Sequence, residues 1–200
     1  SGRTDSGVHA LRQIANFDWE TDMATCDIIP ALNGNLPEDI RINDCAVVSG
    51  VFHARFSAVK RQYVYHCRTD EYILDRNTIW QTGPLDLNRL NELADKIVGE
   101  HNFTSFSKFN PEIENRVCNI YLSEWSNESG IVNYRVAANR FLHHMVRYLV
   151  GTMVEVTRKK MTKLEFEEIL NNPQENVHIY KAPPQGLFLE KVEYDGADIF

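Results

Sequence analysis

The strongest constraint on the fold is a hairpin pattern in the middle of the chain. Residues 120–125 and 131–137 are two strand-like segments separated by the turn residues Asn127–Gly130, an arrangement typical of a β-hairpin. Strands and helices otherwise alternate along the chain, but a hairpin requires antiparallel neighbours. We therefore expect an α+β fold, with helices packed on one face of a mostly antiparallel sheet.

Two helices carry clear start signals. Asp86 is a good N-cap for a helix that ends at Gly99. Thr162 and Glu165 have the spacing of a capping box, which predicts a short helix that ends before Pro173. The apolar face of the first helix comprises Leu87, Leu90, Ala94 and Ile97.

The first third of the chain gives weaker signals. Residues 13–17 are predicted as a strand by alternation, and residues 45–48 as a strand because they form a continuous apolar run. Residues 27–32 suggest a short helix, in which Pro30 is tolerable only near the start. Residues 62–68 alternate as a strand that places on one face Tyr63, Tyr65 and Cys67.

Residues 141–156 form a helical segment whose apolar side chains cover most of its circumference, so we expect burial on more than one side. A buried arginine requires an acceptor, and Arg147 therefore needs a carboxylate or a phosphate. The alternative is that it bonds backbone carbonyls or reaches the surface along its aliphatic stem. The polar residues form a narrow stripe made of Arg140, His143, His144, Arg147 and Gly151.

Composition limits the possible partners. With 200 residues, 43% of them hydrophobic and 24% charged, the chain can form one large domain or two small ones. The net charge of -7 weighs against a nucleic-acid partner, although an acidic total allows a local basic groove. The four cysteines are far apart and form no CxxC pair, which favours reduced thiols in a cytoplasmic protein over disulfides or zinc. No apolar run approaches the roughly 18 residues of a membrane span.

Residues Ser1–Ala10 concentrate chemical groups in a loop-like segment. They include one carboxylate, one guanidinium and two glycines. Gly2 and Gly7 can take backbone angles that other residues avoid, so they suit a tight turn with Asp5 at its tip. The simplest alternative is that Asp-Ser-Gly is an ordinary surface turn without chemistry.

This decapeptide contains the motif GRTDxGVHA, and with it the chain resembles the TruA-type tRNA pseudouridine synthases. Six further blocks of that family recur downstream in the same order. They are Asn33–Pro37, Phe52–Ala58, Lys60–Tyr65, Asn102–Phe106, Asn139–Arg147 and Gly186–Leu189. Family members carry a strand, a helix and a further strand before the motif, so we expect this chain to lack that N-terminal segment.

The resemblance implies two sub-domains that share a sheet, with the catalytic cleft between them. We expect residues 1–57 to form the remainder of the N-terminal sub-domain with the catalytic loop, and residues 58–200 the C-terminal one. The implied function is isomerisation of uridine to pseudouridine in the anticodon stem-loop of tRNA, at nucleotides 38–40, by a cytoplasmic homodimer. That reaction moves no electron or phosphoryl group, so we expect no cofactor, no metal and no membrane partner.

The resemblance also implies roles for four charged residues. It assigns the nucleophile to Asp5 and places Arg147 against it. A guanidinium at that point favours the ionised carboxylate, which is the form that can attack. Arg55 is implied to reach toward the displaced nucleotide, the alternative being a surface ion pair. Arg3, in the same motif as Asp5, is expected to bind substrate.

Two uncharged residues complete the predicted site. A uridine in folded tRNA must leave its stack before a side chain can reach its glycosidic bond. Tyr63 can replace that stacking, at about 1–3 kcal/mol per base, and its hydroxyl can relay a proton. The alternative is a half-buried strand tyrosine. Leu187 is expected in the apolar wall beneath the uracil, the alternative being ordinary strand core.

Two other functions fit the residues. One is a catalytically inactive RNA-binding module of α+β fold. The other is a hydrolase in which Asp5 and His9 form an acid–base pair, although a second positioned carboxylate and a serine elbow are missing from the sequence. We interpret His9, His143 and His144 as polar residues beside the cleft, because no carboxylate or cysteine completes a ligand set at fixed spacing.

Overall fold

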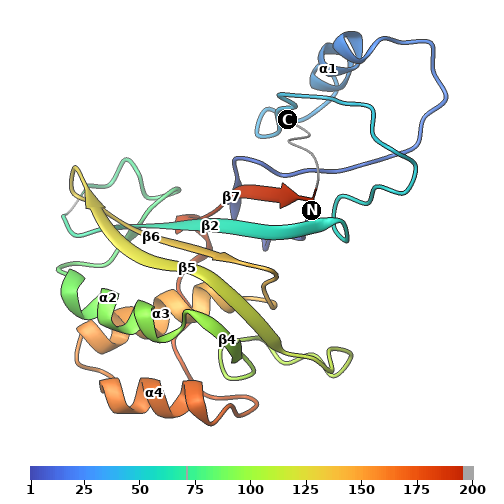
Figure 1. Cartoon of the computed structure of the whole chain (residues 1–200). Helices are drawn as coiled ribbons and strands as arrows, with labels where there is room; N and C mark the ends of the chain where they lie inside the picture. Colours follow the sequence, from blue (N-terminus) through green and yellow to red (C-terminus); the bar gives the residue numbers. More distant parts are fainter. Residues whose placement is uncertain (71, 196–200) are drawn as a thin grey trace.

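A seven-stranded sheet forms the centre of the described part of the computed structural model, which comprises residues 1–70 and 72–195. The strand order is β1-β7-β2-β6-β5-β4, with β3 beside β2 (Figure 1). The β1–β7 and β2–β3 pairs are parallel and the other pairs are antiparallel. The strands are β1 (His9–Ala10), β2 (Ala58–Arg68), β3 (Trp80–Gln81), β4 (Gly99–Asn102), β5 (Val117–Glu128), β6 (Ile131–Ala138) and β7 (Leu187–Tyr194).

Three of the four α-helices cover one face of this sheet, and the fourth lies apart with the N-terminal residues (Figure 1). Helix α2 packs on β5 and α3, and α3 packs on α4. Among the described residues, no helix has both the length and the apolarity to cross a bilayer. The predicted α+β class is confirmed. The helices are α1 (Thr25–Asn33), α2 (Leu87–Lys96), α3 (Met145–Thr157) and α4 (Lys163–Asn171), with a 3-10 helix η1 (Pro184–Gly186) before β7.

The core between the sheet and these helices is apolar and aromatic. Apolar side chains of β2, β5 and β6 meet those of α2, α3 and α4 there, which is why the sheet can form without a second covering layer. The largest fully buried side chains include Tyr65, Tyr134, Phe103, Phe106, Phe166, Leu149 and Met153.

Segments with self-contained signals fold as the sequence predicts. The hairpin joins β5 to β6 through Ser129 and Gly130, both with positive φ (53° and 86°), as a two-residue hairpin turn requires. The Asp86 side chain accepts from the Arg89 N–H at the start of α2. Both hydrogen bonds of the Thr162–Glu165 capping box are present at α4.

The two strands predicted from residues 13–17 and 45–48 are wrong. Neither segment is a strand in the structure. A strand needs a neighbour for its backbone groups, but Ile14 O accepts from the Ser1 ammonium, and Asn16 Oδ1 accepts from the Ala54 N–H at 2.9 Å. These are loop contacts rather than a ladder.

Helix α1 is present where predicted, but Pro30 lies in its interior rather than near its start. The helix is nevertheless tied to the chain at its C-terminal end. The Asn33 side chain accepts from the Ile42 N–H at 2.8 Å and donates to the Ile42 carbonyl at 2.9 Å. This pair of bonds holds the C-terminal end of α1 against residue 42.

Strand β2 begins at Ala58, directly after the boundary predicted at residue 57. Before it, the described chain contains only the short elements β1 and α1. The division into residues 1–57 and 58–200 as two sub-domains stays a prediction.

Candidate active site

The loop that carries Asp5 is fixed on its C-terminal side. The Val8 N–H donates to the Asp5 carbonyl at 3.0 Å and closes a turn, in which Gly7 takes a φ of 79° beside Pro184. Strand β1 then pairs with β7 through His9 and Phe188. The prediction that Gly7 takes a backbone angle that other residues avoid is confirmed. The same prediction for Gly2 is wrong, because Gly2 does not take a left-handed φ.

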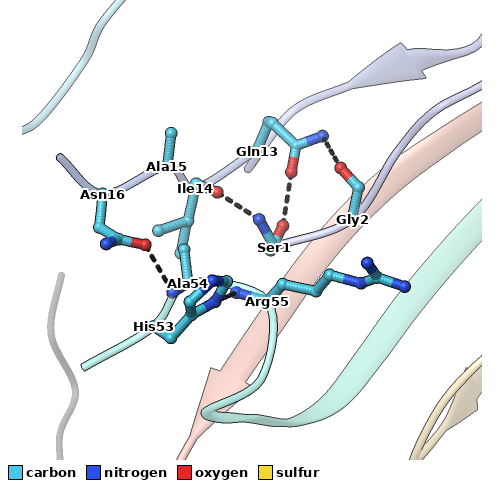
Figure 2. Close-up of a pocket in the computed structure, with 9 residues that line it drawn as sticks. All are labelled: Ser1, Gly2, Gln13, Ile14, Ala15, Asn16, His53, Ala54 and Arg55. Carbon is cyan, nitrogen blue, oxygen red and sulfur yellow. Dashed lines mark hydrogen bonds between the residues drawn. The ribbon is translucent and has the colours of Figure 1, made fainter. Parts of the chain in front are cut away.

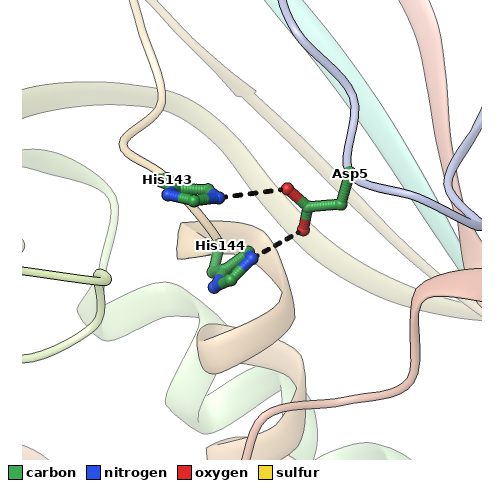
Figure 3. Close-up of side chains that lie close together, drawn as sticks. All are labelled: Asp5, His143 and His144. Carbon is green, nitrogen blue, oxygen red and sulfur yellow. Dashed lines mark ion pairs between the residues drawn. The ribbon is translucent and has the colours of Figure 1, made fainter.

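Three nitrogen atoms surround the Asp5 carboxylate. Arg147 Nη1 donates to Oδ2 at 2.7 Å, and His144 Nε2 lies 3.1 Å from the same oxygen. His143 Nε2 lies 3.3 Å from Oδ1 (Figure 3). The predicted contact between Arg147 and Asp5 is therefore present in the structure. What these residues do in catalysis stays a prediction.

Sequence reasoning missed the contacts of the two histidines. It extended the helix back to Phe141, but α3 begins at Met145, and His144 takes a left-handed φ of 65° just before it. That turn, rather than a helix face, directs both imidazoles at Asp5. The carboxylate comes from the other end of the chain, so no local spacing shows it. The one feature of the sequence that indicates these contacts is that His143 and His144 share a polar stripe with Arg147, the predicted partner of Asp5.

The geometry of this cluster would allow a metal ion. Ligand atoms of Asp5, His143 and His144 lie within 4.8 Å of one another. However, the Arg147 guanidinium already occupies Oδ2, and Lys181 Nζ lies 3.5 Å from His144 Nδ1. Two cations so close repel a third. That no metal binds here stays a prediction.

Arg147 is held by the chain segment that runs alongside α3. Its Nε donates to the Ala182 carbonyl at 2.8 Å, and the Ala182 N–H donates to the Arg147 carbonyl at 3.0 Å. The approach is possible because Gly151 has no side chain. A Cβ at Gly151 would lie 2.2 Å from Tyr180 O and 2.8 Å from Ala182 N. Gly151 thus allows the packing that orients Arg147.

Gly151→Ala is therefore expected to destabilise the protein. The methyl group would collide with backbone atoms that cannot rotate away, so the 180–182 segment would have to shift, at a cost of about 1–3 kcal/mol or more. Urea unfolding measures this free energy. Gly50→Ala is the control, because Gly50 has open space around its Cβ position. Equal unfolding free energies for the two variants would contradict the close-packing argument.

Tyr63 and Leu187 lie on neighbouring strands, β2 and β7. Tyr63 is half-buried, with its ring edge-on to Phe141 at 5.0 Å. Burial raises the pKa of Tyr63 to about 12, with the Arg61 charge opposing and the Asp5 charge adding to the rise. Its hydroxyl is therefore protonated at neutral pH and acts as a donor. Leu187 is buried in the main core.

Arg3 and Arg55 are exposed. Arg55 lines a surface pocket of about 390 Å³ with Ser1, Gln13 and His53, and its side chain extends away from those residues (Figure 2). Asp5 does not line this pocket. The structure therefore does not bring Arg3 or Arg55 into contact with the carboxylate.

Arg61 is a second residue whose place the sequence analysis missed. Its guanidinium donates to the carbonyls of Ala58 (2.8 Å) and Asn139 (2.9 Å), and also to that of Arg55. These bonds join the segment before β2 to the segment before α3. Arg61 thereby fixes the backbone from which the Arg55 side chain projects.

His9 is engaged away from the Asp5 carboxylate. Its ring stacks on Phe188 at 4.6 Å, and its Nε2 lies 2.9 Å from the Asn77 carbonyl oxygen. The acid–base pair of Asp5 and His9, on which the hydrolase interpretation rests, therefore has no support in the structure.

Comparison with known proteins gives a consistent result. A family model described as tRNA pseudouridine synthase matches residues 93–195. The chain is 36% identical over 199 residues to tRNA pseudouridine synthase A of Exiguobacterium, covering 99% of this chain and 81% of the relative. It is 39% identical over 195 residues to the enzyme of the same name from Chlorobium limicola, covering 97% and 80%. With that from Bacteroides thetaiotaomicron it shares 37% identity over 204 residues, covering 100% and 76%.

Proposed function

The chain belongs to the tRNA pseudouridine synthase A family of isomerases, and from this we propose that Asp5 is the nucleophile that isomerises uridine in the anticodon stem-loop of tRNA. The observation that carries the proposal is the paired carboxylate. Asp5 is bonded to the buried Arg147 through Oδ2. A guanidinium in that position pairs with the negative charge of a carboxylate and fixes the direction of one of its oxygens, as the positioning of a nucleophile requires.

The reaction is an isomerisation, so the elemental composition of uridine is unchanged. The bond between N1 of the base and C1′ of the ribose breaks, and a bond between C5 and C1′ forms. A proton leaves C5 and another is added at N1. An Asp5 oxygen gives its electron pair either to C1′, as the N1–C1′ pair leaves with uracil, or to C6, as the C5–C6 π pair moves into the ring carbonyl. The carboxylate is released when the new C–C bond is complete.

The substrate class follows from the family and from the site's aromatic group. Flipping a nucleotide out of its stack costs a few kcal/mol of stacking free energy. Stacking of the base on an aromatic side chain recovers part of this cost. Tyr63 has its ring packed on one edge by Phe141 and lies close enough to Asp5 for the carboxylate charge to affect its pKa. We propose that its ring contacts the target uracil, that Leu187 supports the base, and that Arg3 and Arg55 contact the RNA.

The proposed target is tested with a set of unmodified tRNA transcripts. In each transcript one uridine of the anticodon stem-loop is replaced by cytidine, and pseudouridine is then mapped after incubation with the chain. We expect the yield to fall, relative to the unaltered transcript, when the replaced anticodon stem-loop uridine is the target. Unchanged yield in all these transcripts, with pseudouridine elsewhere, would contradict the proposed target but not the isomerase activity.

Tyr63→Phe and Tyr63→Leu separate stacking from proton donation. The first keeps the ring and loses only the hydroxyl, while the second loses both. If the hydroxyl donates a proton in the mechanism, the Tyr63→Phe variant is nearly inactive yet binds RNA. If only the ring matters, Tyr63→Phe is active and Tyr63→Leu is inactive. Tritium release from C5-labelled tRNA measures this, with Tyr121→Phe, at a half-exposed position on β5, as the control. Wild-type rates for both Tyr63 variants would remove the stacking proposal.

The homodimer and the cytoplasmic location that the resemblance implies stay predictions. Analytical ultracentrifugation of the purified chain tests the first directly. A chain that binds tRNA without forming pseudouridine would instead support the inactive RNA-binding module.

A further inference from the structure

The two oxygens of the Asp5 carboxylate are held unequally. Oδ2 is bonded to Arg147, whose side chain is 10% exposed, and lies 3.1 Å from Nε2 of His144, which is 13% exposed. Among residues 1–70 and 72–195, the one side chain paired with Oδ1 is His143, at 3.3 Å, and it is 48% exposed. The partners of Oδ2 are therefore sheltered and fixed, whereas the partner of Oδ1 can turn into solvent.

The surroundings of His144 select one tautomer. His144 Nε2 lies 3.1 Å from Asp5 Oδ2, where the lone pair of an unprotonated nitrogen would be repelled by the carboxylate, so this contact favours the form in which Nε2 carries the proton. On the other side of the ring, Lys181 Nζ lies 3.5 Å from Nδ1. An ammonium only donates, so Nδ1 must be the unprotonated nitrogen. The two contacts, from different parts of the chain, require the same Nε2–H form.

The charges around His144 also disfavour the imidazolium. Burial is the largest cause that lowers the pKa of His144 to about 4. His143, Lys181 and Arg147 act in the same direction, and the Asp5 charge opposes them. Tyr148, whose ring centroid lies 6.2 Å away, completes the titratable groups that pack against it. At neutral pH, His144 is therefore an uncharged donor.

An uncharged donor suits a nucleophile better than a second cation. It orients the carboxylate without withdrawing further charge from it, and Arg147 alone balances the Asp5 charge. The backbone of His144 is also held in a sparsely populated conformation, with a φ of 65°. Such conformations occur where surrounding structure enforces them, often at functional sites.

We propose that His144 is a positioning residue: with its tautomer fixed by Lys181, it holds Oδ2 of Asp5 together with Arg147, so that Oδ1 is the oxygen that attacks the uridine. This inference rests on the proposed function of Asp5. His143 covers Oδ1 in the substrate-free protein and turns away when the nucleotide enters.

The tautomer is tested by nuclear magnetic resonance of the full chain labelled with ¹⁵N-histidine. The His144 signals are assigned by their loss in His144→Gln. We expect a protonated Nε2 and an unprotonated Nδ1 at neutral pH. Lys181→Met should move the titration of His144 to higher pH, because a positive charge that opposes protonation is removed. Lys96→Met, which removes an exposed lysine at the far end of α2, should leave it unchanged.

Kinetics test the positioning role with two variants of His144. Both introduced side chains are unbranched at Cβ, so the left-handed backbone conformation costs them a similar free energy. His144→Gln retains an N–H donor near the position of Nε2, and His144→Leu does not. We expect Leu to lower kcat by about 10- to 100-fold, the range for a hydrogen bond to a charged group, with KM for tRNA unchanged and Gln substantially rescuing kcat. Lys181→Met should shift the acidic limb of the kcat profile to higher pH.

Each outcome decides the proposal. Equal kcat for the Gln and Leu variants, an Nδ1–H tautomer, or an imidazolium at neutral pH would overturn it. If both His144 variants fail to fold, the His144 signals are assigned instead by through-bond correlation with its backbone, and the wild-type tautomer and the Lys181→Met titration still give the answer. If the wild-type chain forms no pseudouridine, the proposed function fails, and the resonance result remains a separate measurement.

Discussion

Asp5→Asn is expected to abolish pseudouridine formation while leaving tRNA binding intact. The amide keeps the size and much of the hydrogen bonding of the carboxylate, but it cannot give an electron pair to carbon as a carboxylate oxygen does. Removal of a covalent nucleophile typically lowers kcat by more than about a thousandfold. We therefore expect the variant to form no pseudouridine. Its affinity for unmodified tRNA should equal that of the wild type.

The control for this change is Asp95→Asn, which makes the same substitution at an exposed position of α2. It should retain wild-type turnover. Because the introduced amide can slowly deamidate back to Asp, the mass of the variant is followed during the assay. Turnover near the wild-type rate without deamidation would remove Asp5 as the nucleophile.

Arg147→Met is expected to lower both stability and activity. The guanidinium is buried and donates to Asp5 Oδ2 and to the Ala182 carbonyl. Methionine fills similar volume but leaves both acceptors without this donor. Breaking one side of a buried ion pair costs about 3–5 kcal/mol, and the lower end applies here because Asp5 is partly exposed. Urea unfolding gives the free energy, and turnover should be lost even at temperatures where the variant is folded.

Arg89→Met, at an exposed position on α2, is the matched control and should change stability little. A double-mutant cycle with Asp5→Asn then isolates the pair from the remaining contacts of Arg147. Additive free energies in that cycle would show that the two residues do not stabilise each other.

Local signals in the sequence are sufficient to predict an element where the segment satisfies its own backbone hydrogen-bonding groups. The capping box of Thr162 and Glu165, the N-cap of Asp86 and the hairpin turn all lie within a few residues of the element they start or join. Residues 13–17 could not be predicted in the same way. Alternation shows that a segment can form a strand, but whether it does depends on a neighbouring strand that the segment itself does not specify.

In the candidate site, too, some contacts can be predicted from the sequence and others cannot. Asp5 and Arg147 were predicted as partners from the resemblance and from the need of a buried arginine for an acceptor. The contacts of His143 and His144 with Asp5 depend on the left-handed turn at His144, after which α3 begins at Met145, four residues later than predicted. At that turn the His143 carbonyl accepts from the Lys108 N–H at 2.9 Å, a contact from a distant segment that local spacing does not show. The exposed Arg3 and Arg55 have no such packing, so neither sequence nor structure fixes their side chains.

We infer that this chain converts uridine in tRNA to pseudouridine through Asp5. The most direct test is nucleoside analysis of unmodified tRNA after incubation with the purified wild-type chain and, in parallel, with Asp5→Asn. We predict pseudouridine with the wild type, none with the variant, and intact tRNA in both. Absence of pseudouridine from tRNA that the wild-type chain demonstrably binds, or its formation at equal rates by both proteins, would contradict the claim.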